Sequence, residues 1–225
     1  MFYFNRLFTL LEYKEYPIYR QEIVKYIDSI IPPTANNILV FGDKFYGLEY
    51  KWSKSFPQRK VANLDLLYKD WSYISDNNPQ MELPLEKNSF DTIVAYHGLE
   101  KSLDPQRLIL QLRKALISNG KFIFITYNSS HIYSLYTIMI DELISVKDGA
   151  FKEGNIQHFS YNQLKYLYED TGLEVEKEDI YAIKDHSTGT KQLLRITENP
   201  YITALSLIFI CNKIETFPFF ESVYL

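Results

Sequence analysis

The sequence contains only one cysteine, Cys211, which stands in an apolar run near the C-terminus. A lone cysteine excludes an intrachain disulfide and any metal site built on several thiolates. The four histidines are scattered, with no His-x-His or His-x3-His pair, so we expect no metal site. The scarcity of cysteine and the lack of a signal-peptide pattern in the aromatic N-terminal segment predict a cytoplasmic protein.

Long apolar runs are also missing, since no stretch reaches the roughly 20 residues that a membrane-spanning helix needs. The formal net charge is −4, and no block of Lys and Arg is dense enough to follow a phosphate backbone. We therefore expect no membrane and no nucleic acid among the partners. Aromatic residues are abundant instead, with 19 Tyr and 15 Phe. They cluster at both termini, and they indicate either a large core or a surface through which a homodimer forms.

Short apolar runs alternate along the chain with amphipathic patterns of helical spacing. Runs typical of strands lie at residues 37–42, 60–66, 90–97, 121–128, 173–183 and 204–214, with a further candidate at 71–74. Helical patterns lie at residues 17–31, 47–55, 103–117, 132–143 and 160–172. This order predicts an α/β fold with a doubly wound, mostly parallel, seven-stranded sheet.

The last two expected strands follow each other with no helix between them. Because parallel neighbours need a crossover, the last strand, near residues 205–214, should run antiparallel between the strands near Phe122 and Val175. We expect a single domain over residues 1–225, with an N-terminal helical segment at 1–33. Residues 129–158 form an insertion that we expect to act as a lid over the carboxyl ends of the strands.

Three blocks of the sequence follow one another in a characteristic order: MELPLEKNSFDTIVAYHGLEKSLDP, LILQLRKALISNGKFIFITYN and NIQHFSYNQLKYLYEDTGLEVE. With these blocks the chain resembles the class I S-adenosylmethionine-dependent methyltransferases, from about Asn36 to Asp185. The nearest likeness is to the branch found beside bacterial sugar and glycan enzymes. The resemblance implies a Rossmann-like methyltransferase fold, S-adenosylmethionine as cofactor, and a small-molecule or sugar- or glycan-related acceptor.

The loop after the first expected strand departs from the family pattern, acid-x-Gly-x-Gly-x-Gly. Val40, Gly42, Lys44 and Tyr46 stand at those places, and Gly47 comes one step late. Side chains at such positions occupy space that a ligand needs beside the backbone. By position in the family pattern, the expected cofactor-binding residues are Gly42, Lys44, Gly47, Asp65 on the ribose, and Asp76 and Asn77 beside the adenine.

His97 is the candidate catalytic residue, because it follows the strand expected at 90–97, where this architecture carries its chemistry. An imidazole suits the removal of a proton from the acceptor, although a histidine that only hydrogen-bonds within its loop is the alternative. The residues expected to line the acceptor pocket are Tyr127, Asn128, His131 and His158.

The altered loop leaves two functions open. One is a methyltransferase with a rebuilt loop. The other is a catalytically inactive protein with the methyltransferase fold, which serves as a binding or partner subunit. A nicotinamide-dependent dehydrogenase is disfavoured, because it would need the G-x-G-x-x-G pattern after the first strand.

Overall fold

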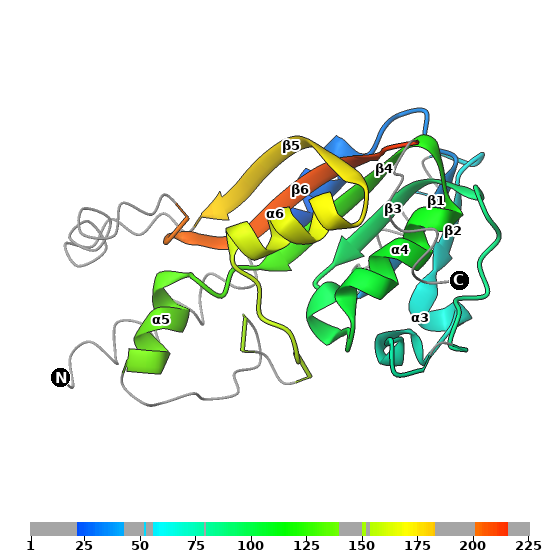
Figure 1. The fold of residues 1–225 in the computed structure, drawn as a ribbon. Coiled ribbons are helices and arrows are strands. Elements are labelled where there is room, and N and C mark those ends of the chain that lie inside the picture. Colours follow the sequence, from blue (N-terminus) through cyan, green and yellow to red (C-terminus); the bar gives the residue numbers. More distant parts are fainter. Residues whose placement is uncertain are drawn as a thin grey trace.

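The computed structural model describes residues 22–42, 52, 56–78, 80–139, 150–151, 154–182 and 201–215. These residues form one sheet of six strands, in the order β2-β1-β3-β4-β6-β5 (Figure 1). The strands are β1 (Asn37–Gly42), β2 (Lys60–Asn63), β3 (Phe90–Tyr96), β4 (Leu116–Tyr127), β5 (Leu173–Ala182) and β6 (Ala204–Lys213). The expected α/β architecture is therefore confirmed.

The direction of the last strand agrees with the sequence prediction. Strands β1 to β4 pair in parallel, whereas β6 runs antiparallel to both of its neighbours, β4 and β5. Cys211 of β6 lies opposite Phe122 on one side and Val175 on the other. The sequence predicted this order from the lack of a helical pattern between the two strands, although residues 183–200 of the connection lie outside the described residues.

The expected seventh strand, at residues 71–74, is wrong. Trp71–Tyr73 form a short 3-10 helix, η1, in which the N–H of Ile74 bonds to the carbonyl of Trp71. Trp71 and Ile74 are both buried. Residues three apart lie on the same side of a 3-10 turn but on opposite faces of a strand, so only the turn buries both. The described residues consequently form six strands.

Helices cover both faces of the sheet. The helices are α3 (Leu64–Leu67), α4 (Pro105–Ala115), α5 (Ile132–Met139) and α6 (Tyr161–Asp170), with a second 3-10 helix, η2 (Leu99–Lys101). Helices α4 and α6 lie on the same face of the sheet in Figure 1, where their apolar side chains form one core cluster with Phe41 and Phe124. Helical residues 22–30 and Trp52 form the other core cluster with Val40 and Ile125. The backbone N–H of Arg107 donates to Oδ1 of Asp104 at 2.9 Å, so α4 begins at the expected cap.

The described parts of the expected insertion, 129–158, lie beyond the carboxyl end of β4. The N–H of Ser129 donates to the carbonyl of Phe159 at 2.8 Å, and the N–H of Ile132 to the carbonyl of Ile202 at 2.8 Å. Residues 140–149 and 152–153 lie outside the described residues, so the role of the insertion as a lid stays a prediction, as does the single domain.

Two further expectations concern the ends of the chain and the membrane. The aromatic clusters on which a homodimer was expected fall mostly in residues 1–21 and 216–225, outside the described residues. Within the described part of the chain, no helix combines the length and the hydrophobicity needed to cross a membrane.

Candidate functional site

The carboxyl ends of β1 and β3 are in backbone contact at Gly42. Gly42 has a φ of 107° and pairs with Tyr96 in the sheet. A Cβ placed on Gly42 would lie 2.2 Å from the carbonyl oxygen of Tyr96 and 2.8 Å from Cα of Gly98. Only glycine tolerates both the dihedral and this approach. The chain leaves β1 toward β2 and returns to β3 on the other side, so this corner is the switch point where such sheets bind ligands.

Asp65 closes the same corner from the first turn of α3, two residues after β2 ends. Its Oδ2 accepts the N–H of Gly42 at 3.2 Å, and its Oδ1 accepts the indole N–H of Trp71 at 3.0 Å. A carboxylate has about four acceptor positions, so two donors leave room for two more. Asp65 is only half-buried, and its remaining acceptor positions could accept hydrogen bonds from a polar ligand.

The expected adenine-side residues, Asp76 and Asn77, lie in an exposed turn after η1. Oδ1 of Asp76 is 3.3 Å from the guanidinium of Arg107 in α4, and the Asp76 side chain is 54% exposed. Lys44 and Gly47, the other expected cofactor residues, lie outside the described residues. Their roles therefore stay predictions.

His97, the expected catalytic residue, is buried directly after β3, with 1% of its surface exposed. Its φ is 48°, and its backbone N–H donates to the carbonyl of Ile125 at 2.8 Å. The imidazole stacks on the ring of Tyr127, with centroids 3.6 Å apart and 9° between the planes. The structure thus brings together two residues that were named separately from the sequence.

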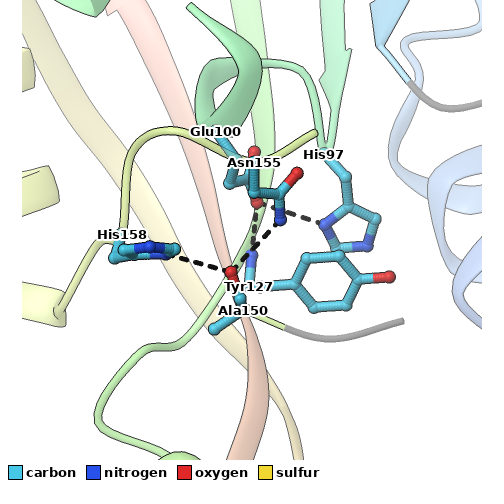
Figure 2. Close-up of polar contacts among 6 residues, drawn as sticks. All are labelled: His97, Glu100, Tyr127, Ala150, Asn155 and His158. Atoms are coloured by element: carbon cyan, nitrogen blue, oxygen red, sulfur yellow. Dashed lines mark hydrogen bonds and ion pairs between the residues drawn. The ribbon is translucent and has the colours of Figure 1, made fainter. Parts of the chain in front are cut away.

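The carboxylate of Glu100 lies beside this stacked pair, although the sequence patterns did not indicate Glu100 as a site residue. Nδ1 of His97 lies 3.4 Å from Oε1 of Glu100, which also accepts the backbone N–H of Tyr127 at 2.7 Å (Figure 2). Glu100 is 1% exposed. The signal was present in the sequence, since Glu100 follows His97 by three residues in a block that resembles the methyltransferases.

Asn128 and His131 lie in the connection from β4 to α5. Nδ2 of Asn128 donates to the carbonyls of Tyr201 and Ala204, at 2.8 and 2.9 Å. The N–H of His131, a buried residue, donates to the carbonyl of Asn128 at 3.1 Å. Both residues thus lie at the carboxyl end of β4, where they were expected, and Asn128 uses its amide to hold the start of β6.

His158 approaches from the other end of the insertion. Its Nδ1 donates to the carbonyl of Ala150 at 3.0 Å, and Nδ2 of Asn155 reaches the same oxygen at 3.2 Å. Figure 2 shows Asn155 beside Glu100 and His158 farther from His97. Among the residues that the structure describes, no group of three metal-ligating side chains occurs.

Comparison with known proteins identifies the family of the chain. The sequence profile of the family described as "Methyltransferase domain" matches residues 36–178. No curated protein matches the chain.

Several solved structures share the fold. An S-adenosylmethionine-dependent methyltransferase of Thermotoga maritima, described as a possible histamine N-methyltransferase, is 12% identical with a TM-score of 0.54, over 95% of this chain and 100% of that one. A methyltransferase of Mesorhizobium loti is 15% identical with a TM-score of 0.52, over 84% and 96% of the two chains. One of Archaeoglobus fulgidus is 14% identical with a TM-score of 0.53, over 86% and 94%.

Proposed function

The chain belongs to the methyltransferase-domain family, and from that membership we propose that it transfers a methyl group from S-adenosylmethionine to a small-molecule or glycan-related acceptor. The observation that carries the proposal is the contact between Gly42 and Asp65 at the switch point of the sheet. A half-buried carboxylate with free acceptor positions at this corner has the chemistry to hold a ribose. The likeness of the sequence blocks to the glycan-associated branch supports the class of acceptor.

Under this proposal, Asp65 and His97 would have different roles in the reaction. Asp65 would hold the ribose hydroxyls, and the bound cofactor would supply an electrophilic methyl group on a sulfonium. His97 would accept the proton of the acceptor as its oxygen or nitrogen takes up the methyl group. Alignment of the two reactants is worth up to roughly 7–11 kcal/mol, and a positioned base adds about 10²–10⁴-fold in rate.

A specific observation favours a second candidate, a catalytically inactive binding or partner subunit. His97 is 1% exposed, and one face of its ring is covered by Tyr127. A base that exchanges a proton with an acceptor needs a path to it. A site that stays closed would suit a protein that keeps the fold and has lost the reaction.

Calorimetric titration with S-adenosylmethionine and S-adenosylhomocysteine, followed by Asp65→Ala, tests the proposal. Loss of hydrogen bonds to a charged group costs about 1.5–3 kcal/mol, so Asp65→Ala should weaken binding by roughly 10- to 150-fold. Asp70→Ala is the matched control, because Asp70 is an exposed aspartate five residues away, at the start of η1. Native protein that binds neither compound would contradict the proposal and favour the inactive candidate.

A further inference from the structure

Glu100 is a carboxylate buried where β3 and β4 end, with 1% of its surface exposed. Burial of a charged group is costly unless hydrogen bonds compensate for the lost water. Oε1 accepts the backbone N–H of Tyr127 at 2.7 Å and lies 3.4 Å from Nδ1 of His97. Within the described residues, Oε2 has no hydrogen-bond partner. His97 is therefore the side chain that pairs with this carboxylate in the described part of the chain.

The position of His97 is fixed by its backbone and by two contacts of its imidazole. The backbone has a positive φ of 48°, which strains a non-glycine residue and persists only where the surroundings enforce it. The backbone N–H of His97 donates to the carbonyl of Ile125, and Tyr127 covers one face of the imidazole ring. Glu100 lies at the Nδ1 edge. These contacts fix the position of the second ring nitrogen, Nε2.

The chemistry of the pair decides which ring nitrogen holds the proton. An ionised carboxylate only accepts hydrogen bonds, so Nδ1 must carry a proton to pair with Oε1. In the neutral ring, Nε2 is then left with its lone pair, which is the form that a general base needs. We propose that Glu100 is a positioning residue that holds His97 in its Nδ1–H tautomer and leaves Nε2 as the base. The catalytic part of this inference rests on the proposed methyl transfer.

The backbone of Glu100 also bonds to the end of the expected insertion. Its carbonyl accepts the N–H groups of Ile156 and Gln157, at 2.7 and 2.9 Å. Residues 154–159 are thereby attached to η2, the 3-10 helix that carries Glu100. A shift of this segment would therefore be transmitted to the residue whose carboxylate lies beside His97.

The proton position is measurable in ligand-free protein from the ¹⁵N chemical shifts of the imidazole. The variant His97→Gln identifies the His97 signals among those of the four histidines. The native neutral ring should carry its proton on Nδ1. The share of this tautomer should fall in Glu100→Gln, which keeps the shape and removes the charge, and further in Glu100→Met, which has no oxygen acceptor.

A native ring with its proton on Nε2 overturns the proposal, and so does an unchanged tautomer ratio in Glu100→Gln. The native measurement decides even where a variant does not fold.

Steady-state kinetics measure the catalytic consequence separately. Glu100→Gln should lower kcat by about 10- to 100-fold with an unchanged KM for S-adenosylmethionine, a smaller loss than the roughly 10²–10⁴-fold of His97→Gln. Glu169→Gln, an exposed glutamate of α6, should keep the native kcat. Transfer that proceeds at the native rate in Glu100→Gln overturns this inference and leaves the proposed function standing. If the native protein transfers no methyl group, the proposed function fails, and the tautomer measurement alone decides the role of Glu100.

Discussion

The backbone N–H of Gly42, at the last position of β1, donates to Oδ2 of Asp65 at 3.2 Å. The other carboxylate oxygen accepts the indole N–H of Trp71 at 3.0 Å. Asp65 is therefore held at both oxygens, by a strand end on one side and by η1 on the other. An acid oriented in this way presents its remaining acceptor positions in a fixed direction.

The orientation of Asp65 should depend on Trp71. The variant Trp71→Phe removes the indole donor and keeps an aromatic ring near Phe41, whose centroid is 5.3 Å from that of Trp71. Since a hydrogen bond contributes about 1 kcal/mol, we expect affinity for S-adenosylhomocysteine to fall about fivefold in calorimetry. The matched control is Trp52→Phe, which loses an indole bond to Asp28 in the other core cluster. It should lower the free energy of unfolding without changing affinity, and equal losses of affinity would refute the role of Trp71.

Gly42 should be intolerant of a side chain. In Gly42→Ala the new Cβ would lie 2.2 Å from the carbonyl oxygen of Tyr96, with φ at 107°. We expect the free energy of unfolding to fall by about 3 kcal/mol or more in urea denaturation, because backbone atoms cannot move aside cheaply.

Gly154→Ala provides the comparison for Gly42→Ala. Gly154 also has a positive φ, 89°, but among the described residues beyond its chain neighbours no atom lies within 4 Å of its Cβ position. It should cost only the conformational strain, about 1–2 kcal/mol. Equal losses in the two variants would show that the contact with Tyr96 is unimportant.

The hydrogen bond between helical residues 22–30 and β5 should weaken in acid. The hydroxyl of Tyr26 donates to Oδ2 of Asp179 at 2.6 Å. Burial opposes ionisation of Asp179, but hydrogen bonds from Tyr26 and Ile180 and the charge of Lys177 outweigh it and lower the pKa below the usual 3.8. A lowered carboxyl pKa stabilises the fold above the unfolded pKa, and this contribution is lost as the pH falls through the folded pKa.

We therefore expect Tyr26→Phe to lower the free energy of unfolding at pH 7 by about 0.5–1 kcal/mol, since the pair is partly exposed. The difference from the native protein should shrink below pH 4, where Asp179 becomes protonated. Tyr166→Phe, on an exposed position of α6, should match the native protein throughout. A difference between Tyr26→Phe and native protein that stays constant down to pH 2 would contradict the assignment.

Cys211 should report on opening of the sheet. It is buried in β6, and burial, followed by the nearby charge of Glu178, raises the pKa of its thiol. Since the thiolate is the reactive form, a thiol reagent at pH 8 should modify the native protein at least about 100-fold more slowly than the protein in urea. Cys211→Ala is the silent control. Rapid modification of the native protein would place this strand outside the stable core.

Local patterns in the sequence predicted most of the sheet. The apolar runs and the Asp104 cap each depend on neighbours in the chain, and the structure confirms the strands, the cap and the antiparallel direction of β6. The turn at residues 71–74 could not be predicted in this way. Trp71 is buried in η1 because Phe41 and Asp65 contact its ring and its N–H, and those partners come from other segments.

The candidate site was likewise predictable from the sequence only in part. His97 and Tyr127 could be named from the sequence, because they stand at the ends of apolar runs whose carboxyl ends meet in a parallel sheet. Their stacking, and the approach of Glu100 to both, required the tertiary structure. The pairing of Tyr96 with Ile125 sets β3 against β4, and the positive φ of His97 turns its ring onto Tyr127. Sequence patterns indicate strand ends and helix caps, because these features depend on residues that are close together in the chain. The partner of a buried carboxylate depends on strand register and on one unusual dihedral, which packing of the whole sheet imposes.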